Sequence, residues 1–187
     1  MSAHSLATRY GKSLLGLAQE KGKLEEVFKD VKAIDSILEN HHDLKMAFKS
    51  PIIPTDKKLT IIRKIFEGNV SDMTYKFMEL VTKKRREAEL HGIFAAFITQ
   101  YNIIKGITPV KLTSAVKLDA PLVQNIINSL KVKEKLATVE LRETVDEDII
   151  GGFILQYDDK MLDNSVSRSL NNLKTVVEDD TYIKKYS

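Results

Sequence analysis

Apolar residues recur every three or four positions through the first 105 residues of the chain. This spacing places them on one face of a helix, so it predicts amphipathic helices rather than strands. The strongest of these apolar stripes consists of Leu90, Ile93, Phe94, Phe97, Ile98, Tyr101 and Ile104. Helices of this length are marginal alone and must bury their stripes against one another. We therefore predict a six-helix bundle over residues 1–105.

Turn-forming residues divide this first half into its helices. Gly22 ends the first helix. Pro51 and Pro54 separate the third helix from the fourth, because a proline disfavours helical dihedrals in the residue before it. We expect Thr55 and Ser71 to cap the helices that follow them, each with a side-chain oxygen that accepts an otherwise unpaired backbone amide.

At Gly106 the pattern changes from a helical period to strict alternation, which is typical of half-buried strands. The alternating or strand-like segments are residues 110–118, 137–141, 153–157 and 160–162. The last two are separated only by Asp158 and Asp159, the spacing of a tight hairpin. Helical stripes follow the first strand and the hairpin, and a polar tail begins at Glu178. Residues 106–187 are thus predicted to form an α+β unit, a small sheet with two helices.

The composition is that of a globular protein, with 43% hydrophobic and 29% charged residues among 187. The absence of cysteine excludes disulfides, thiolate metal sites and cysteine nucleophiles. No apolar run approaches the ~20 residues needed to span a bilayer. The N-terminus also lacks the basic and apolar regions of a secretory signal, so we expect a soluble protein that is not exported.

The net charge of +3 is too small to require a polyanionic partner. It is unevenly distributed, because residues 1–106 carry the basic excess and residues 107–187 carry a slight acidic excess. Two halves with different charge balances indicate two surfaces with different partners.

Motifs for catalysis or cofactor binding are incomplete. Gly11-Lys12-Ser13 matches the end of a phosphate-binding loop, but Leu6 stands where that loop requires its first glycine. His41 and His42 are adjacent, so their side chains diverge, and no Asp, Glu or Cys stands at ligand spacing from them. Neither acidic cluster between residues 146 and 163 supplies both the glycine and the glutamate of a calcium-binding loop. We expect no enzyme activity, no cofactor and no metal site.

Two further features admit two interpretations. The basic run Lys83-Lys84-Arg85-Arg86 is either a solvated helix end, where cations interact favourably with the helix dipole, or a patch for nucleic acid or anionic lipid. A small nucleic-acid-binding module using this run is the alternative function. Gly151-Gly152 is either an anion-binding nest or a flexible entry into a strand. The second is favoured because no helix start follows it.

The segment from Gly151 to Leu170 contains a Gly-Gly pair, an apolar strand, Asp-Lys-Met-Leu and Asp-Asn-Ser-Val in that order. It closely resembles the C-terminal signature of the delta subunit of F-type ATP synthases, the family of the mitochondrial oligomycin sensitivity-conferral protein. Residues 7–18, 50–58 and 77–97 are similar to the family's first helix, its loop into the fourth helix, and its fifth and sixth helices. The resemblance covers roughly residues 5–175 with all four strings in order.

The chain departs from the family's pattern in three places. The family often has glycine where this chain has Asp158 and Asn164. Both residues accept left-handed backbone dihedrals, so we expect both turns to be kept. Asn-Gly-Arg is common in the family where this chain has Lys84-Arg85-Arg86, and the loss of that glycine predicts a longer fifth helix.

The resemblance implies a non-catalytic stator subunit, part of the peripheral stalk of the proton-translocating F-type ATP synthase. Residues 1–105 would bind N-terminal segments of the alpha subunits of the catalytic head, and residues 106–187 would contact the C-terminal ends of the b subunits. Rotation is thereby coupled to ATP synthesis. The chain would associate peripherally with the cytoplasmic face of the bacterial inner membrane through the complex, without nucleic acid and without being an obligate homo-oligomer.

The resemblance also implies that one alpha-subunit helix lies in a groove between the first and fifth helices. We expect this groove to be lined by Tyr10, Leu14 and Leu17 from the first helix and by Phe77, Leu80 and Val81 from the fifth. Packing of these residues inside the bundle alone is the alternative. Leu80 is the most informative, because it is apolar yet lies off the deepest stripe of its helix.

Overall fold

The computed structural model describes residues 3–134 and 136–183. The chain divides into two compact units, residues 1–104 and 105–187. The first is helical, and the second combines a four-stranded sheet with helices. The prediction of a helical part followed by an α+β part is confirmed in this broad form.

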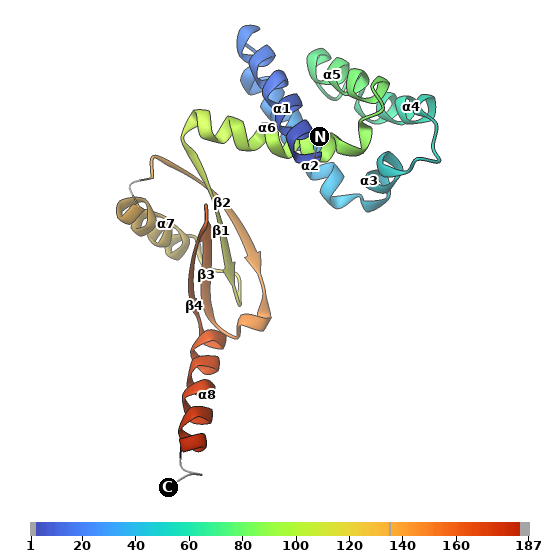
Figure 1. The fold of residues 1–187 in the computed structure, drawn as a ribbon. Helices are drawn as coiled ribbons and strands as arrows, with labels where there is room; N and C mark the ends of the chain where they lie inside the picture. The colour runs from blue at the N-terminus through green and yellow to red at the C-terminus, as the bar shows by residue number, and fades with distance from the viewer. Residues whose placement is uncertain (1–2, 135, 184–187) are drawn as a thin grey trace. The chain divides into compact units, whose positions relative to one another are not determined.

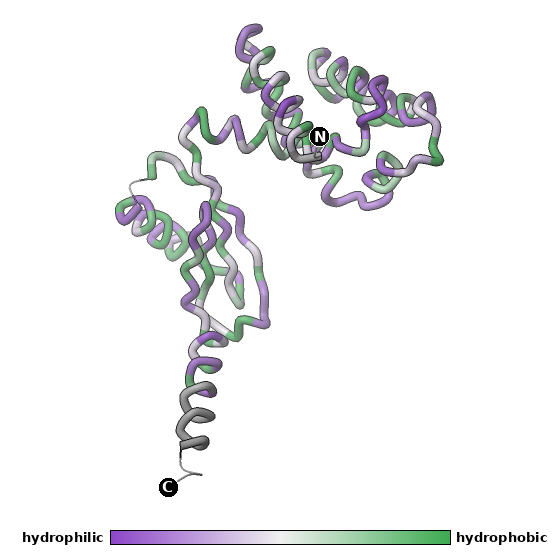
Figure 2. The backbone as a smooth tube through the Cα atoms, in the orientation of Figure 1, coloured by the Kyte–Doolittle hydropathy of each residue, from purple (hydrophilic) through white to green (hydrophobic). Residues whose placement is uncertain are grey.

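The helices of the first unit lie before the sheet in the chain and are labelled in Figure 1. They are α1 (Ala3–Glu20), α2 (Leu24–Asn40), α3 (His42–Lys49), α4 (Thr55–Phe66), α5 (Asp72–Lys83) and α6 (Leu90–Lys105), with a short 3-10 helix, η1 (Glu87–Glu89), between α5 and α6. Polar and apolar residues alternate every few positions along them, as the changing colours of the tube show in Figure 2. This is the amphipathic pattern that a packed set of helices requires.

Helix α6 contributes the centre of this unit's core. Leu90, Ile93, Phe94 and Phe97 are all almost completely buried. Helix α1 crosses α6 so closely at Gly11 that an added Cβ there would lie 3.0 Å from the backbone nitrogen of Phe97. Gly11 is therefore required for helix packing, which explains a glycine that otherwise suggests a phosphate-binding loop.

Of the two predicted helix caps, the one at Ser71 is present and the one at Thr55 is not. Ser71 caps α5 as expected, since its side chain accepts a hydrogen bond from the backbone nitrogen of Thr74. The prediction for Thr55 is wrong, because Thr55 is the first residue of α4 and Pro54 holds the cap position without a side-chain hydrogen bond. The proline ring fixes φ at −60° and so sets the extended conformation before the helix, but its side chain has no oxygen that could accept from a backbone nitrogen.

The expected lengthening of the fifth helix is also wrong. Helix α5 ends at Lys83, and Arg85 takes a left-handed conformation with φ of 57°. The backbone nitrogens of Arg85 and Arg86 donate to the carbonyls of Thr82 and Val81, at 2.9 and 3.1 Å. These two bonds form a Schellman turn, which offsets the cost of about 1–2 kcal/mol for a left-handed residue that has a Cβ.

The second unit contains a mixed sheet with strand order β2-β1-β3-β4. Its elements are β1 (Ile107–Ser114), α7 (Ala120–Glu134), β2 (Thr138–Val145), the 3-10 helix η2 (Glu147–Ile149), β3 (Gly152–Tyr157), β4 (Lys160–Ser165) and α8 (Val166–Ile183). Strands β1 and β2 are parallel and joined through α7, whereas β1 with β3 and β3 with β4 are antiparallel. Residues Val110, Leu112, Leu155 and Tyr157 of the sheet form a core with Val123 and Leu130 of α7.

The hairpin between β3 and β4 is confirmed. Tyr157 pairs with Lys160, and Asp158 between them takes a φ of 46°. A left-handed turn was expected at Asn164 as well, and there the prediction is wrong. Asn164 is not left-handed but pairs with Phe153 inside β4. Strand β4 continues to Ser165, so Asn164 must keep an extended backbone.

The Gly151-Gly152 pair is a place of close approach rather than of flexibility. Gly152 has a φ of 76°, and an added Cβ would lie 2.1 Å from the carbonyl oxygen of Asn164. The backbone nitrogen of Gly151 donates to the carbonyl of Ile149 at 2.8 Å, which closes a γ-turn around Ile150 at φ of 67°. Such turns are rare and strained, particularly at a β-branched residue.

Helix α8 continues past Glu178, where a polar tail was predicted, and reaches Ile183. Residues 184–187 of that predicted tail lie outside the described residues. Within the described chain, none of the helices has the length and apolarity required to cross a membrane.

Candidate functional site

A groove runs between α1 and α5, with a volume of about 390 Å³. Helix α1 contributes Arg9, Tyr10, Ser13, Leu14 and Leu17, helix α5 contributes Phe77 and Leu80, and Arg86 follows α5 in the chain. We call this set the α1–α5 groove. Most of its lining is apolar, although both helices belong to a unit with a well-formed core of its own.

The apolar side chains of the groove differ in depth. Leu14 is only 1% exposed and forms part of the floor, whereas Leu17 and Leu80 are 41% and 51% exposed on the two walls. The rings of Tyr10 and Phe77 meet edge to face with centroids 6.4 Å apart, which links the two helices across the groove. Side chains of this kind gain free energy only when a second apolar surface covers them.

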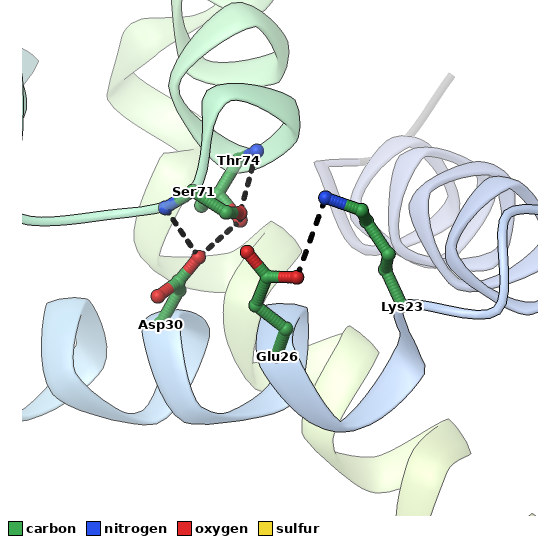
Figure 3. A network of polar contacts seen from close by, with 5 residues as sticks. All are labelled: Lys23, Glu26, Asp30, Ser71 and Thr74. Atoms are coloured by element: carbon green, nitrogen blue, oxygen red, sulfur yellow. Dashed lines mark hydrogen bonds and ion pairs between the residues drawn. The ribbon is translucent and has the colours of Figure 1, made fainter.

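The start of α5 is fixed by a contact from α2. Asp30 accepts hydrogen bonds from the backbone nitrogen of Ser71 at 2.8 Å and from the hydroxyl of Thr74 at 2.9 Å (Figure 3). A carboxylate at a helix N-terminus also interacts favourably with the helix dipole. The wall of the groove that contains Phe77 and Leu80 is thus held by a residue more than 40 positions earlier in the chain.

The region after α5 is fixed by a buried ion pair. Lys58 of α4 donates to Glu87 and to the carbonyl of Phe48, both at 2.8 Å, and its side chain is almost fully buried. Because Glu87 directly follows Arg86, this pair also determines where Arg86 can lie.

A second hollow lies along α5 and shares Leu80 with the groove. Its other lining residues are Lys76, Glu79, Lys83 and Lys84. Lys76 pairs with Asp72 at 2.7 Å and Lys83 with Glu79 at 2.8 Å. The hydrogen bond that Lys76 donates to Asp72, and the negative charge of Asp72, raise the pKa of Lys76. The basic run is therefore not a uniform patch, since Lys83 is paired with a carboxylate while Arg86 turns into the α1–α5 groove.

Five of the six residues expected at the groove line this one cavity, namely Tyr10, Leu14, Leu17, Phe77 and Leu80. The sixth, Val81, is completely buried and does not line it. Val81 follows Leu80 by 100° around the helix, which turns its side chain away from the groove and into the core. Whether the lining residues bind a partner is a separate question from where they lie.

Sequence reasoning missed Arg9, Ser13 and Arg86. For α1 a signal existed, because Arg9, Ser13 and Leu17 are four residues apart and must follow one edge of the apolar stripe. Arg86 gave no such signal, since it lies outside the helix and depends on the left-handed turn at Arg85.

The residues considered for catalysis are dispersed. His91 lies 3.9 Å from Asp35 and 3.4 Å from Lys45, whereas His41 and His42 are at the junction of α2 and α3. No cluster of three His, Cys, Asp or Glu side chains suited to a metal ion occurs within residues 3–134 and 136–183.

On the second unit, the first turns of α8 leave apolar side chains uncovered. Val166, Leu170 and Leu173 are four and three residues apart and are between 42% and 62% exposed. They form an apolar stripe on this helix, at the spacing that an amphipathic helix uses to bind a neighbour.

Comparisons with known proteins agree with each other. A family model described as ATP synthase delta (OSCP) subunit matches residues 6–177. The ATP synthase subunit delta of Cytophaga hutchinsonii is 38% identical over 176 residues, covering 93% of this chain and 94% of the relative. That of Christiangramia forsetii is 33% identical over 180 residues, covering 96% of each.

A similar fold occurs in a solved structure. The likeness is to a chain in the cryo-EM structure of the Toxoplasma gondii mitochondrial ATP synthase hexamer, with a TM-score of 0.71. It covers 92% of this chain and 97% of the other at 19% identity, so it supports the fold.

Proposed function

Because this chain belongs to the ATP synthase delta (OSCP) subunit family, and is therefore a peripheral-stalk component of the F-type ATP synthase, we propose that its α1–α5 groove binds the N-terminal helix of an alpha subunit. The alpha subunits belong to the catalytic head, which must be kept from turning with the rotor. The observation that carries this proposal is an apolar groove whose walls, Leu17 and Leu80, are about half exposed in the chain alone.

An amphipathic helix is the occupant that fits this geometry. A helix that lays apolar residues into a groove is a common mode of peptide recognition. The groove supplies a buried floor at Leu14, an aromatic pair at Tyr10 and Phe77, and two uncovered leucines. Full burial of one leucine side chain contributes about 1.5–3 kcal/mol. Because Leu17 and Leu80 are already about half buried, covering both contributes about as much as burying one fully exposed leucine.

We propose further that α1–α6 act as one six-helix bundle toward the head, while the second unit binds the C-terminal ends of the b subunits. The uncovered apolar stripe of α8 supports the second assignment. The chain would then join two partners at the cytoplasmic face of the inner membrane, without an active site of its own and without self-association. No comparison supports the nucleic-acid-binding alternative.

Replacing Leu80 with Asp tests the groove. Leu80→Asp removes apolar contact and places a charge in an apolar interface, so we expect the dissociation constant for an alpha-subunit N-terminal peptide to rise at least about 100-fold. Fluorescence anisotropy with a labelled peptide measures this. The fold should persist, because Leu80 is half exposed; circular dichroism checks this.

Ile104→Asp is the matched control, since Ile104 of α6 is also 51% exposed but does not line the groove. Its peptide affinity should equal that of the unmodified chain. Unchanged binding by folded Leu80→Asp would show that the helix binds elsewhere.

A further inference from the structure

The rims of the α1–α5 groove carry two cations without a matching anion. Arg9 lies on the α1 side and Arg86 on the α5 side, and the residues that line the groove include no Asp or Glu. Among the described residues, no ion pair or side-chain hydrogen bond joins a partner to the guanidinium of Arg9 or of Arg86. The nearby Lys76 and Lys83 differ, because each has a carboxylate one turn away on its own helix.

The position of Arg86 is built into the fold. The left-handed Arg85 and the two Schellman hydrogen bonds turn the chain sharply at the end of α5. Immediately after the turn, Glu87 is held by the buried Lys58. Arg86 lies between these two fixed points and is itself only partly exposed. Its backbone therefore has little freedom to move away from the groove that Arg86 lines.

We infer that the helix bound in the α1–α5 groove carries carboxylates on the two flanks of its apolar stripe, opposite Arg9 and Arg86, and that these pairs decide which helix is accepted. This inference rests on the proposed function of the groove and specifies the partner's chemistry. Guanidinium groups bind carboxylates through two parallel hydrogen bonds, which requires a defined geometry. The bound helix also excludes water from the rims, which strengthens each pair.

Electrostatic pairs at the edge of an interface act mainly on specificity and on orientation. The apolar floor accepts any helix with a suitable stripe, in either direction. Two cations on opposite rims distinguish acidic from basic helices and favour the orientation that brings a carboxylate to each. A helix with lysine in those places would meet like charges and would be rejected.

The test uses the full chain and a peptide of about 20 residues, long enough for a helix of ~30 Å, from the N-terminus of the alpha subunit encoded in the same genome. Its Asp and Glu residues are replaced by Asn and Gln in a second peptide. We expect the neutral peptide to bind about tenfold more weakly at low salt. The difference should vanish at ~1 M salt, where the screening length falls to ~3 Å.

Variants of the chain test whether Arg9 and Arg86 cause the preference for the acidic peptide. Arg9→Gln and Arg86→Gln should each weaken binding of the acidic peptide about threefold, and together they should remove its advantage over the neutral peptide. Lys12→Gln is the matched control, because Lys12 is an exposed cation on α1 that does not line the groove. It removes the same charge and should leave the preference unchanged.

The outcomes separate the inference from the proposed function. If the acidic and neutral peptides bind equally well and Leu80→Asp abolishes both, the groove binds its helix but the inference about charge is wrong. An alpha-subunit N-terminus without Asp or Glu beside its apolar stripe would also overturn the inference. If neither peptide binds the unmodified chain, the proposed function of the groove itself fails.

Discussion

Tyr101 shows how much one side chain of α6 contributes to holding the first unit together. Its ring stacks on Phe28 of α2 with centroids 3.8 Å apart, and its hydroxyl donates to Glu25 at 2.7 Å. Burial, and then the hydrogen bond and charge of Glu25, raise the pKa of Tyr101 to about 12. The protonated hydroxyl is therefore part of the native structure.

This pKa predicts a loss of stability at high pH. Up to pH ~10, Tyr101 is protonated in the folded and unfolded states alike, so its full contribution is present. Above that, the unfolded chain releases the proton first, and the free energy of unfolding falls by up to about 1.4 kcal/mol per pH unit until the pH passes about 12. Urea unfolding of the unmodified chain and of Tyr101→Phe between these pH values measures the difference.

Tyr101→Phe should be less stable by about 1 kcal/mol at neutral pH, because it lacks the hydrogen bond to Glu25. The gap should close and then reverse as the pH rises through this window, because a fall of about 1.4 kcal/mol per pH unit over about two units exceeds a gap of about 1 kcal/mol. The remaining tyrosines titrate in both proteins and cancel in the comparison. A gap that stays constant from neutral pH to about 12 would contradict the raised pKa of Tyr101.

The residue types of Lys58 and Glu87 do not reveal that their side chains are buried and paired. Both are charged residues in amphipathic segments, and such residues are usually solvated. In the structure they form a buried ion pair, and Lys58 also donates to the carbonyl of Phe48. Removing one member would leave the other charge buried without its partner, which is strongly destabilising. The pairing depends on α4 and η1 being neighbours, which their sequence patterns do not encode.

At the scale of elements, α5 depends on α2 for its starting point. Ser71 caps the helix from within, and Asp30 adds two hydrogen bonds from outside (Figure 3). The Ser71 cap is visible in the sequence because capping is local. The contribution of Asp30 is not, because it comes from a separate helix.

Asp30→Ala should lower the free energy of unfolding by about 1–3 kcal/mol, since it leaves the backbone nitrogen of Ser71 without its acceptor and removes one acceptor of the Thr74 hydroxyl. Asp30→Asn keeps an acceptor oxygen and loses only the charge. It should therefore recover part of the loss. Urea unfolding at neutral pH ranks the three proteins, and equal stability of Asp30→Ala and the unmodified chain would mean that α5 does not depend on this contact.

Turns show the same division between local and distant causes. The β3–β4 hairpin follows from two adjacent aspartates between strands, and Asp158 is left-handed as expected. Arg85 is also left-handed, although arginine gives no local reason for it. There the Schellman hydrogen bonds and the anchoring of Glu87 impose the turn. Where local backbone hydrogen bonds and a tertiary contact together fix a turn, the preference of its residue no longer decides its conformation.

At the scale of the whole molecule, the two units each have a core of their own. This arrangement suits our proposal that each unit of this peripheral-stalk subunit binds its own partner. Each charge that crosses 100 mV releases about 2.3 kcal/mol, whereas a nanomolar contact is worth about 12 kcal/mol. Work and binding free energy are different quantities, but the comparison favours tight anchoring at more than one surface.

Affinity purification from detergent-solubilised membranes tests whether the first unit binds the catalytic head and the second unit binds the b subunits. A tag on the full chain should recover alpha, beta and b subunits together. A tagged fragment of residues 1–105, which keeps the core of the first unit, should recover the catalytic head without the b subunits. Immunoblotting for each subunit gives the result. Recovery of b subunits by the fragment would show that the second unit is not their binding site.

The sequence by itself determined the order and type of the helices and strands, the hairpin, the Ser71 cap and the family. These features rest on local periodicity, turn chemistry and motif strings, all of which are written within a few neighbouring residues. Only the tertiary structure decided that Val81 lies in the core while Arg9 and Arg86 border the groove. The reason is that the exposure of a side chain depends on the rotation of its helix and on neighbours from distant parts of the chain.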